Sequence, residues 1–258
     1  MAGPEPFDPP DTLPRLFLAA CQRFGDRVAL REKDYGVWQE FTWREYLRHV
    51  RLLAQGLAAL GLRRGETVCI QSENCLEWLL SDLAVQSNGG VVVGVYPTNP
   101  AAEVRYIAQH SDARFYVAED QEQVDKVLAV KDHLPELRRI IVMNVKGVAA
   151  YRDPLVVSFK EVERLGEAFG REHPDWFEQA VAATKPDDLS VISYDDMPLA
   201  DYLHPPLTTV RMPLAELGAA GVDALVDQLL GGEPRDVMVA TEPEVIVRKS
   251  TAPPPECP

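Results

Sequence analysis

Apolar positions between Thr42 and Gly61 recur at helical spacing, three or four residues apart. The apolar residues of this stretch are Tyr46, Val50, Leu53, Leu57 and Leu60. Thr42, with Glu45 three positions later, is a capping-box signature, in which each residue satisfies a backbone amide of the other. We therefore expect an amphipathic helix that begins directly after Thr42 and ends at Gly61.

Short apolar runs alternate with further helical patterns up to residue 145. Runs typical of buried strands lie at 67–71, 91–96, 114–119 and 138–143. Between them, helical patterns occupy 76–87, 101–110 and 121–131. Parallel neighbours need a long return connection, so this alternation predicts parallel strands joined by crossover helices. We interpret residues 11–145 as an α/β layer.

The pattern is less regular from residue 146 to residue 188, where Ser158 and Glu161 mark a second capping box and 173–183 suggests a short helix. The sequence DDLSVI at 187–192 then predicts entry into a buried strand. Beyond it we expect a Pro-rich loop at 204–210, a helix from Pro213 to Leu230 stopped by Gly231 and Gly232, and strands at 236–240 and 244–248.

The amino-acid composition changes near residue 190. The segment 191–258 holds ten of the 21 prolines but only four of the 26 lysines and arginines. We therefore expect four regions: a disordered leader at 1–11, a folded region at 12–189, a second folded region at 190–250 and a disordered tail at 251–258.

The charge balance argues against one class of partner. The chain has 26 basic and 40 acidic residues, a formal net charge of −14, so a polyanion such as nucleic acid is repelled. The amino terminus lacks a basic region followed by an apolar stretch, and no apolar run approaches the length of a membrane span. We expect a cytoplasmic protein without a membrane span, whose four cysteines (Cys21, Cys69, Cys75 and Cys257) stay reduced.

A search for catalytic motifs returns none. The sequence has no G-x-x-x-x-G-K-[ST], G-x-G-x-x-G, G-x-S-x-G or H-E-x-x-H. The five histidines are scattered, and the acidic stretch at 118–125 lies where a helix begins, a place that the helix dipole favours for acids. We assign no catalytic and no metal-binding residue. One polar pair, Asp195 and Asp196, follows a strand pattern and either faces a ligand cleft or caps the next turn.

Two stretches carry a family resemblance: YPTNPAAEVRYI at 96–107 and WFEQAVAATKPDDLSVI at 176–192. Through them, residues 12–189 resemble the amino-terminal part of bacterial long-chain acyl-CoA ligases, in the AMP-binding, adenylate-forming superfamily. The resemblance implies an α/β fold, here an incomplete amino-terminal subdomain of an adenylate-forming enzyme. For the family it implies a fatty acid, ATP, magnesium and coenzyme A as substrates and cofactors.

The sequence departs from that family directly after DDLSVI. In the family such a strand leads into a Ser/Thr/Gly-rich loop ending in Pro-Lys-Gly, which holds the ATP phosphates, whereas this chain continues with SYDDMPLA. Amide, hydroxyl and cationic groups are needed to neutralise the charge that develops at the α-phosphate. The family's later nucleotide motifs and carboxy-terminal domain are also missing. We expect a truncated, inactive relative with no cofactor of its own, and leave open whether it is an enzyme.

Residues 190–255 resemble a different family. The stretches SVISYDDMPLADYLHPPLTTVRMPLAELGAAGVDALVDQLLGG and EVIVRKSTAPP are similar to the carboxy-terminal end of LacI-family transcription regulators, whose ligand-binding core is like periplasmic sugar-binding proteins. By this resemblance Asp195 is an effector-contacting carboxylate, while Ser193 stands where glycine is usual and Met212 where glutamine is frequent. The helix-turn-helix is missing, so we expect no direct DNA binding.

Both families can claim DDLSVI, and this leads to our hypothesis that two unrelated coding sequences were joined inside this strand, by genomic fusion or by an error of sequence assembly. The favoured function is a non-catalytic ligase remnant with a regulator-derived tail. The alternatives are a ligase that is active with a second chain, and a sugar-effector-binding or dimerising fragment. A truncated sheet exposes an edge, which makes self-association a further expectation.

Overall fold

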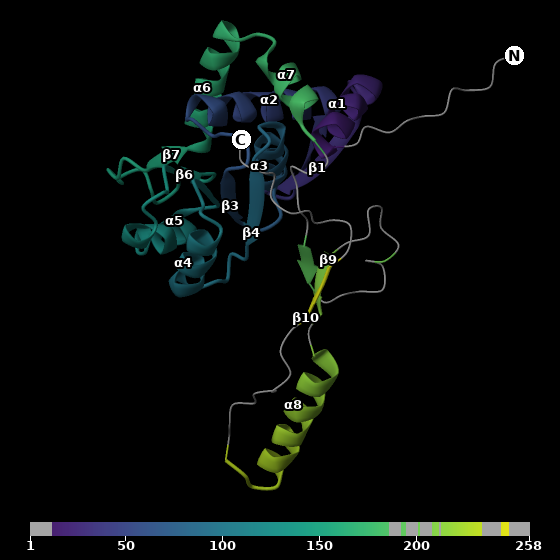
Figure 1. Ribbon diagram of the computed structural model, residues 1–258, viewed down its shortest axis with the longest axis vertical. Coiled ribbons are helices and arrows are strands. Elements are labelled where there is room, and N and C mark those ends of the chain that lie inside the picture. The colour runs from purple at the N-terminus through teal and green to yellow at the C-terminus, as the bar shows by residue number, and fades with distance from the viewer. Residues whose placement is uncertain are drawn as a thin grey trace, which may run out of the picture. The chain divides into compact units, whose positions relative to one another are not determined.

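The computed structural model describes residues 12–185, 192–194, 201, 208–211, 213–233 and 244–247. The chain divides into two units, Met1–Asp188 and Leu189–Pro258. Figure 1 traces the elements of both units. Each unit is described by itself below.

A five-stranded parallel sheet is the centre of the first unit (Figure 1). Its order is β4-β3-β5-β6-β7, with bounds β3 (Thr67–Gln71), β4 (Val91–Val95), β5 (Phe115–Ala118), β6 (Arg139–Val142) and β7 (Val156–Ser158). The inner strands read as continuous apolar runs because helices cover both faces, as in other parallel sheets. The expectation of parallel strands is confirmed, but the layer does not end at residue 145, because β7 extends the sheet.

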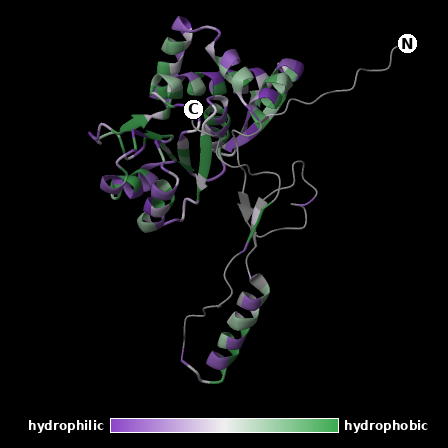
Figure 2. Ribbon diagram, viewed as in Figure 1, coloured by the Kyte–Doolittle hydropathy of each residue, from purple (hydrophilic) through white to green (hydrophobic). Residues whose placement is uncertain are grey.

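Helices divide between the two faces of this sheet. The helices α1 (Leu13–Phe24), α2 (Trp43–Ala59), α3 (Leu76–Ser87), α6 (Phe159–Glu172) and α7 (Trp176–Ala183) contribute to one apolar core. The second core contains residues of α4 (Ala101–His110) and α5 (Gln121–Leu128). It also contains Val130 and Leu134, which flank the short 3₁₀ helix η1 (Lys131–His133). Figure 2 shows the apolar strands in green between helices that carry both purple and green residues.

The helix α2 begins as its sequence predicts. Glu45 N–H donates to Thr42 Oγ1 over 3.2 Å, and Thr42 N–H donates to Glu45 Oε2 over 2.9 Å. Both halves of the capping box are therefore present. On the buried side of α2, Tyr46 meets Phe17 of α1 edge to face, with 4.8 Å between ring centroids.

The less regular stretch 146–188 contains α6 and α7. Ser158 is the N-cap of α6, as the capping-box pattern predicts, and α7 lies within the short helix expected at 173–183. α6 packs closely on α2. Gly166 of α6 lies against the carbonyl of Leu52, and Gly56 of α2 lies against the carbonyl of Val162. A Cβ atom at either glycine would overlap that carbonyl oxygen, so the two helix backbones approach more closely than any larger residue permits.

An antiparallel hairpin precedes α2 and was not among the predicted elements. It consists of β1 (Val28–Asp34) and β2 (Val37–Thr42). Tyr35 and Gly36 form its turn, with φ of 45° and 83°. Two consecutive positive φ values are the geometry of a two-residue hairpin turn whose twist matches that of the strands.

The second unit holds a three-stranded sheet of order β10-β9-β8 and the helix α8 (Leu214–Leu229). Its strands are β8 (Ile192–Tyr194), β9 (Thr208–Arg211) and β10 (Glu244–Ile246). β8 and β9 are parallel, and β9 and β10 are antiparallel. The helix prediction is confirmed to within one residue at each end. The loop prediction at 204–210 is wrong where β9 begins, and the strand predicted at 236–240 lies outside the described residues.

Candidate functional site

The candidate site is a cleft at the carboxyl edge of the five-stranded sheet. The strands β3 and β5 are adjacent in this sheet. The chain runs from β3 to β4 on one side of this pair, and from β5 to β6 on the other side. In open parallel sheets, ligands bind outside the carboxyl ends of the strands, where the connections part in this way. Here a cavity of about 550 Å³ is lined by Glu32, Lys33, Cys75, Glu77, Glu119, Met143, Asn144, Val145, Ser158 and Lys160.

Two glutamates of the cleft accept backbone hydrogen bonds that fix the surrounding loops. Glu119, directly after β5, accepts from Glu73 N–H through Oε2 at 2.8 Å. This bond ties together the loops that follow β3 and β5. Glu32 of the hairpin accepts from Leu76 N–H at 3.3 Å, at the first residue of α3. Because the helix amino terminus carries unpaired amides and partial positive charge, a carboxylate is stabilised there.

Cys75 is the N-cap residue of α3, and its side chain makes no capping hydrogen bond. Its Sγ lies 3.9 Å from Met143 Sδ. Burial is the main cause that raises the pKa of the Cys75 thiol above its ordinary value. The thiol therefore stays protonated near neutral pH, and it is not an activated nucleophile.

The remaining polar side chains allow binding but supply no catalytic pair. Ser158 Oγ accepts from Glu161 N–H at 3.1 Å and so serves as the N-cap of α6. Lys33 places its Nζ 5.9 Å from the ring centre of Trp38. Lys33 and Lys160 bring positive charge to a cleft that also holds three glutamates. In the part of the chain that the structure describes, no three His, Cys, Asp or Glu side chains are grouped to hold a metal ion.

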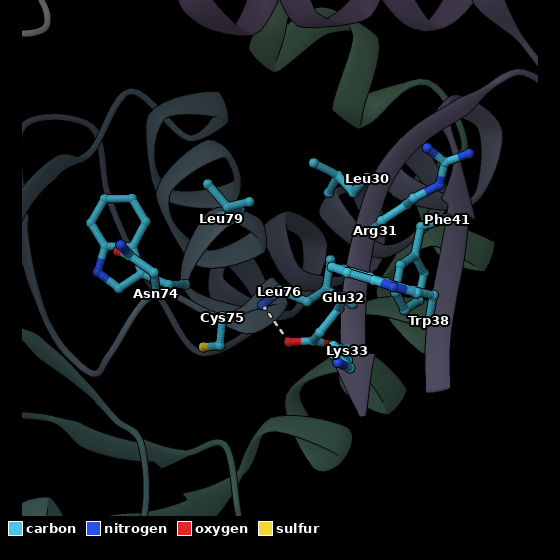
Figure 3. Close-up of a pocket in the computed structure, with 11 residues that line it drawn as sticks. Leu30, Arg31, Glu32, Lys33, Trp38, Phe41, Asn74, Cys75, Leu76 and Leu79 are labelled. Carbon is cyan, nitrogen blue, oxygen red and sulfur yellow. Dashed lines mark hydrogen bonds between the residues drawn. The ribbon is translucent and has the colours of Figure 1, made fainter. Parts of the chain in front are cut away.

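A second, mainly apolar cavity of about 510 Å³ adjoins the first and shares Glu32, Lys33 and Cys75 with it. Figure 3 shows Leu30 and Glu32 of the hairpin directed toward Leu76 and Leu79 of α3. The dashed line in that view is the bond from Leu76 N–H to Glu32. The two cavities together can receive a molecule that has both an apolar and a polar part.

The residue predicted from sequence as an effector contact, Asp195, lies outside the described residues, and so does Asp196. Ser193, which stands where glycine is usual in the regulator resemblance, lies in β8 and is paired with Thr209 of β9. Met212 also lies outside the described residues. The structure therefore describes the strand β8 that precedes Asp195, and the effector contact of Asp195 stays a prediction.

Sequence reasoning missed the residues that line the observed cleft. Glu32 and Lys33 belong to a strand, VALREKD, that is rich in charge and does not resemble a buried strand. A signal was present in Tyr35-Gly36 between two potential strands, since a two-residue turn containing glycine is typical of a hairpin. The proximity of Glu32 to Leu76, 44 positions apart, arises only from tertiary packing.

None of the helices among the described residues is long and apolar enough to cross a membrane. The longest of them is α2, with 17 residues, and its first turn contains the charged residues Arg44 and Glu45. The expectation that no helix spans a membrane therefore holds for the residues that the structure describes.

The long-chain-fatty-acid–CoA ligase ACSBG2 of Xenopus laevis is 34% identical to this chain over 187 residues, which is 72% of this chain and 24% of that protein. The chain thus spans about a quarter of the length of such relatives. The structure of a long-chain-fatty-acid CoA ligase from Rhodopseudomonas palustris is also similar. The aligned region covers 58% of this chain and 36% of that protein's chain, with 26% sequence identity and a TM-score of 0.50.

A third similar protein is the A domain of a carboxylic acid reductase from Segniliparus rugosus, solved with AMP and a co-purified carboxylic acid. The aligned region covers 60% of this chain and 30% of the reductase chain, with 20% sequence identity and a TM-score of 0.53. This likeness supports the α/β fold alone. The first unit therefore has the fold seen in the amino-terminal regions of adenylate-forming enzymes.

Two family models match, and they overlap. The model for a periplasmic binding protein-like domain matches residues 179–251. The model for the AMP-binding enzyme matches residues 17–194. The overlap, 179–194, contains the sequence DDLSVI that both resemblances share. The match to the AMP-binding enzyme model covers well over half of this chain, and the chain therefore belongs to the AMP-binding enzyme family.

Proposed function

We propose that this chain retains the amino-terminal scaffold of a long-chain fatty acid–CoA ligase but does not activate a fatty acid with ATP on its own. The observation that carries the proposal is the sequence SYDDMPLA at 193–200, where the resembling ligases have a phosphate-binding loop. SYDDMPLA has no lysine, glycine or threonine, and Asp195 and Asp196 add negative charge, so the charge that develops during adenylation is not stabilised. Losing one donor to such a developing charge alone reduces turnover by about 10²–10³.

The neighbourhood of that segment supports the proposal. Ile192–Tyr194 pairs with residues 208–210 in the three-stranded sheet of the second unit, and none of the described strands of the five-stranded sheet comes from that unit. In the cleft of the first unit, the Cys75 thiol is held protonated and Ser158 is occupied as a helix cap. A partly apolar cleft next to a polar one agrees with a scaffold that has kept a binding surface.

The test is an assay of the purified chain for both half-reactions of acyl activation. Dodecanoate, palmitate and oleate are each supplied with ATP, magnesium and coenzyme A, and pyrophosphate release and acyl-CoA formation are measured. We expect both to equal the signal of heat-denatured chain, while an intact ligase assayed in parallel gives product. Acyl-CoA above the denatured control would overturn the proposal. A signal that appears only when a second chain is added would support the alternative of an assembled ligase.

A second candidate function is binding of a sugar-like effector by the second unit. It is favoured by the match to a periplasmic binding protein-like domain, and by Asp195 directly following β8 in sequence. Calorimetry with a panel of monosaccharides and disaccharides tests it, with Asp195→Asn as the variant and Asp196→Asn as the matched control. We expect binding, if this function holds, to be lost in the first variant and kept in the second. Under either candidate function, we propose that the protein lies in the cytoplasm and does not bind DNA directly.

A further inference from the structure

β4 is the outer strand of the five-stranded sheet, and β3 is its only hydrogen-bonded neighbour among the described strands (Figure 1). Its sequence, VVVGV, contains no charged residue and no proline. Residues 91–93 are partly exposed and Gly94 is exposed. Natural proteins usually protect such an edge with charge, proline, a bulge or a covering segment, because its free amides and carbonyls can pair with another strand.

The free backbone groups of β4 follow from its register with β3. Val91, Val93 and Val95 lie opposite Thr67, Cys69 and Gln71. Val91 N–H donates to the carbonyl of Glu66, one residue before its partner, at 2.9 Å. In a parallel pair this pattern repeats at every second residue, so the amides and carbonyls of 91, 93 and 95 face β3. Those of Val92 and Gly94 therefore face away from the sheet.

At each end of this edge, one backbone group already has a local hydrogen-bond partner. Gly90 N–H donates to the carbonyl of Val85 at 3.0 Å. The carbonyl of Tyr96 accepts from Gln71 Nε2 at 2.9 Å and from Asn99 N–H at 3.0 Å. Within β4, the residues whose amide and carbonyl both face away from β3 are thus Val92 and Gly94, spaced symmetrically about Val93.

We propose that the β4 edge pairs with the β4 edge of a second copy of this chain. The two strands run antiparallel around a two-fold axis at Val93, and join two five-stranded sheets into one. In this register, Val92 of each copy lies opposite Gly94 of the other, and each such pair exchanges two backbone hydrogen bonds. A two-fold contact of this kind uses the same patch on both subunits and closes on itself, giving a dimer rather than a fibre.

The edge itself favours a second copy over an unrelated strand. Because its two outward-facing residues are equidistant from Val93, a copy of the same strand satisfies all four groups at once. Side chains also fit: Val92 and Gly94 point to the same face of the sheet, and no atom lies within 4 Å of the place where a Cβ of Gly94 would be. The opposite edge strand, β7, has three residues and leads directly into α6, so it offers a shorter edge.

The first experiment is sedimentation velocity of the whole chain at a series of concentrations and at low and high salt. We expect a monomer–dimer equilibrium that shifts toward dimer as salt rises, because each copy carries a net charge of −14. Val92→Lys places a charge where natural edge strands carry one, and should weaken the dimer by about tenfold or more. Val92→Thr is the matched control and should leave it intact. Circular dichroism verifies that both variants fold.

A cysteine crosslink then tests the register. In an antiparallel pair, residues facing each other without mutual hydrogen bonds have Cα atoms about 4.5 Å apart, within the span of a disulfide. In a Cys257→Ser background, Val93→Cys should therefore form an intermolecular disulfide under mild oxidation. Val92→Cys should not, because Gly94 lies opposite it. A monomeric wild type, a dimer insensitive to Val92→Lys, or equal crosslinking of the two cysteine variants would each overturn the proposal.

Discussion

At the scale of single residues, Asp82 is the most informative carboxyl group. It lies on α3, and burial is the main cause that raises its pKa above the ordinary value. A hydrogen bond donated by Gln86 Nε2 over 2.8 Å lowers the pKa, but by less than burial raises it. Since the folded-state pKa is above the unfolded one, the stability linked to this group is fully present below the unfolded pKa. It is lost as pH rises through the folded pKa.

Asp82→Asn removes this charge and keeps an oxygen that can accept from Gln86. We expect the variant to unfold at a higher urea concentration than the wild type at pH 7, and the difference to shrink toward pH 4, near the ordinary Asp pKa of about 3.9. Urea titrations at both pH values measure this. Asp132→Asn, at an exposed position on η1, removes the same charge from the surface and is the matched control for the change in net charge. A difference that does not vary with pH would contradict the argument.

Tyr116 illustrates a buried polar network at the carboxyl end of the sheet. Its hydroxyl donates to Gln71 Oε1 at 2.9 Å, and both side chains are fully buried. Tyr116→Phe leaves that amide oxygen without its donor, and an unsatisfied buried group costs about 1–3 kcal/mol. We expect a loss of stability of that size in chemical denaturation. Tyr106→Phe, on an exposed ring, should unfold like the wild type, and equal midpoints for all three proteins would refute the account.

At the scale of elements, the contact between α2 and α6 depends on glycine. A Cβ at Gly166 would overlap the carbonyl of Leu52, a backbone atom that cannot move without shifting α2. Gly166→Ala should therefore destabilise the first unit by about 1–3 kcal/mol, as overpacking does, despite the higher helix propensity of alanine. Glu167→Ala, at the next and exposed position, is the control. If Gly166→Ala were neutral or stabilising in thermal unfolding, the two helices would not be in this close contact.

Elements with a strong apolar period could be predicted from the sequence, whereas elements defined by their partners could not. β3, α3 and α4 have the predicted bounds, because each is a continuous buried strand or a helix ended by local signals. β7 has three residues and is a strand only because β6 lies beside it. The hairpin β1–β2 is charged and mostly exposed, so its pattern did not mark it. The second, mainly apolar cavity was missed for the same reason, since it lies where that hairpin meets α3.

At the scale of the whole molecule, each sheet takes all its described strands from one unit. β3 to β7 belong to the first unit, and β8, β9 and β10 to the second. The junction falls in the segment where the two family matches overlap, 179–194. Among the described strands, no hydrogen-bond ladder joins the two parts and couples their unfolding, so we do not expect two-state behaviour of the whole chain.

The distribution of tryptophan makes this testable in the intact chain. All four tryptophans, Trp38, Trp43, Trp78 and Trp176, lie in the first unit. In a urea titration, tryptophan fluorescence therefore follows the first unit, while far-ultraviolet circular dichroism follows the helices of both, including α8. We expect the two curves not to coincide, and Gly166→Ala to shift the fluorescence transition while leaving the remaining dichroism transition in place. Coincident curves that move together in the variant would mean that the two parts fold as one cooperative body.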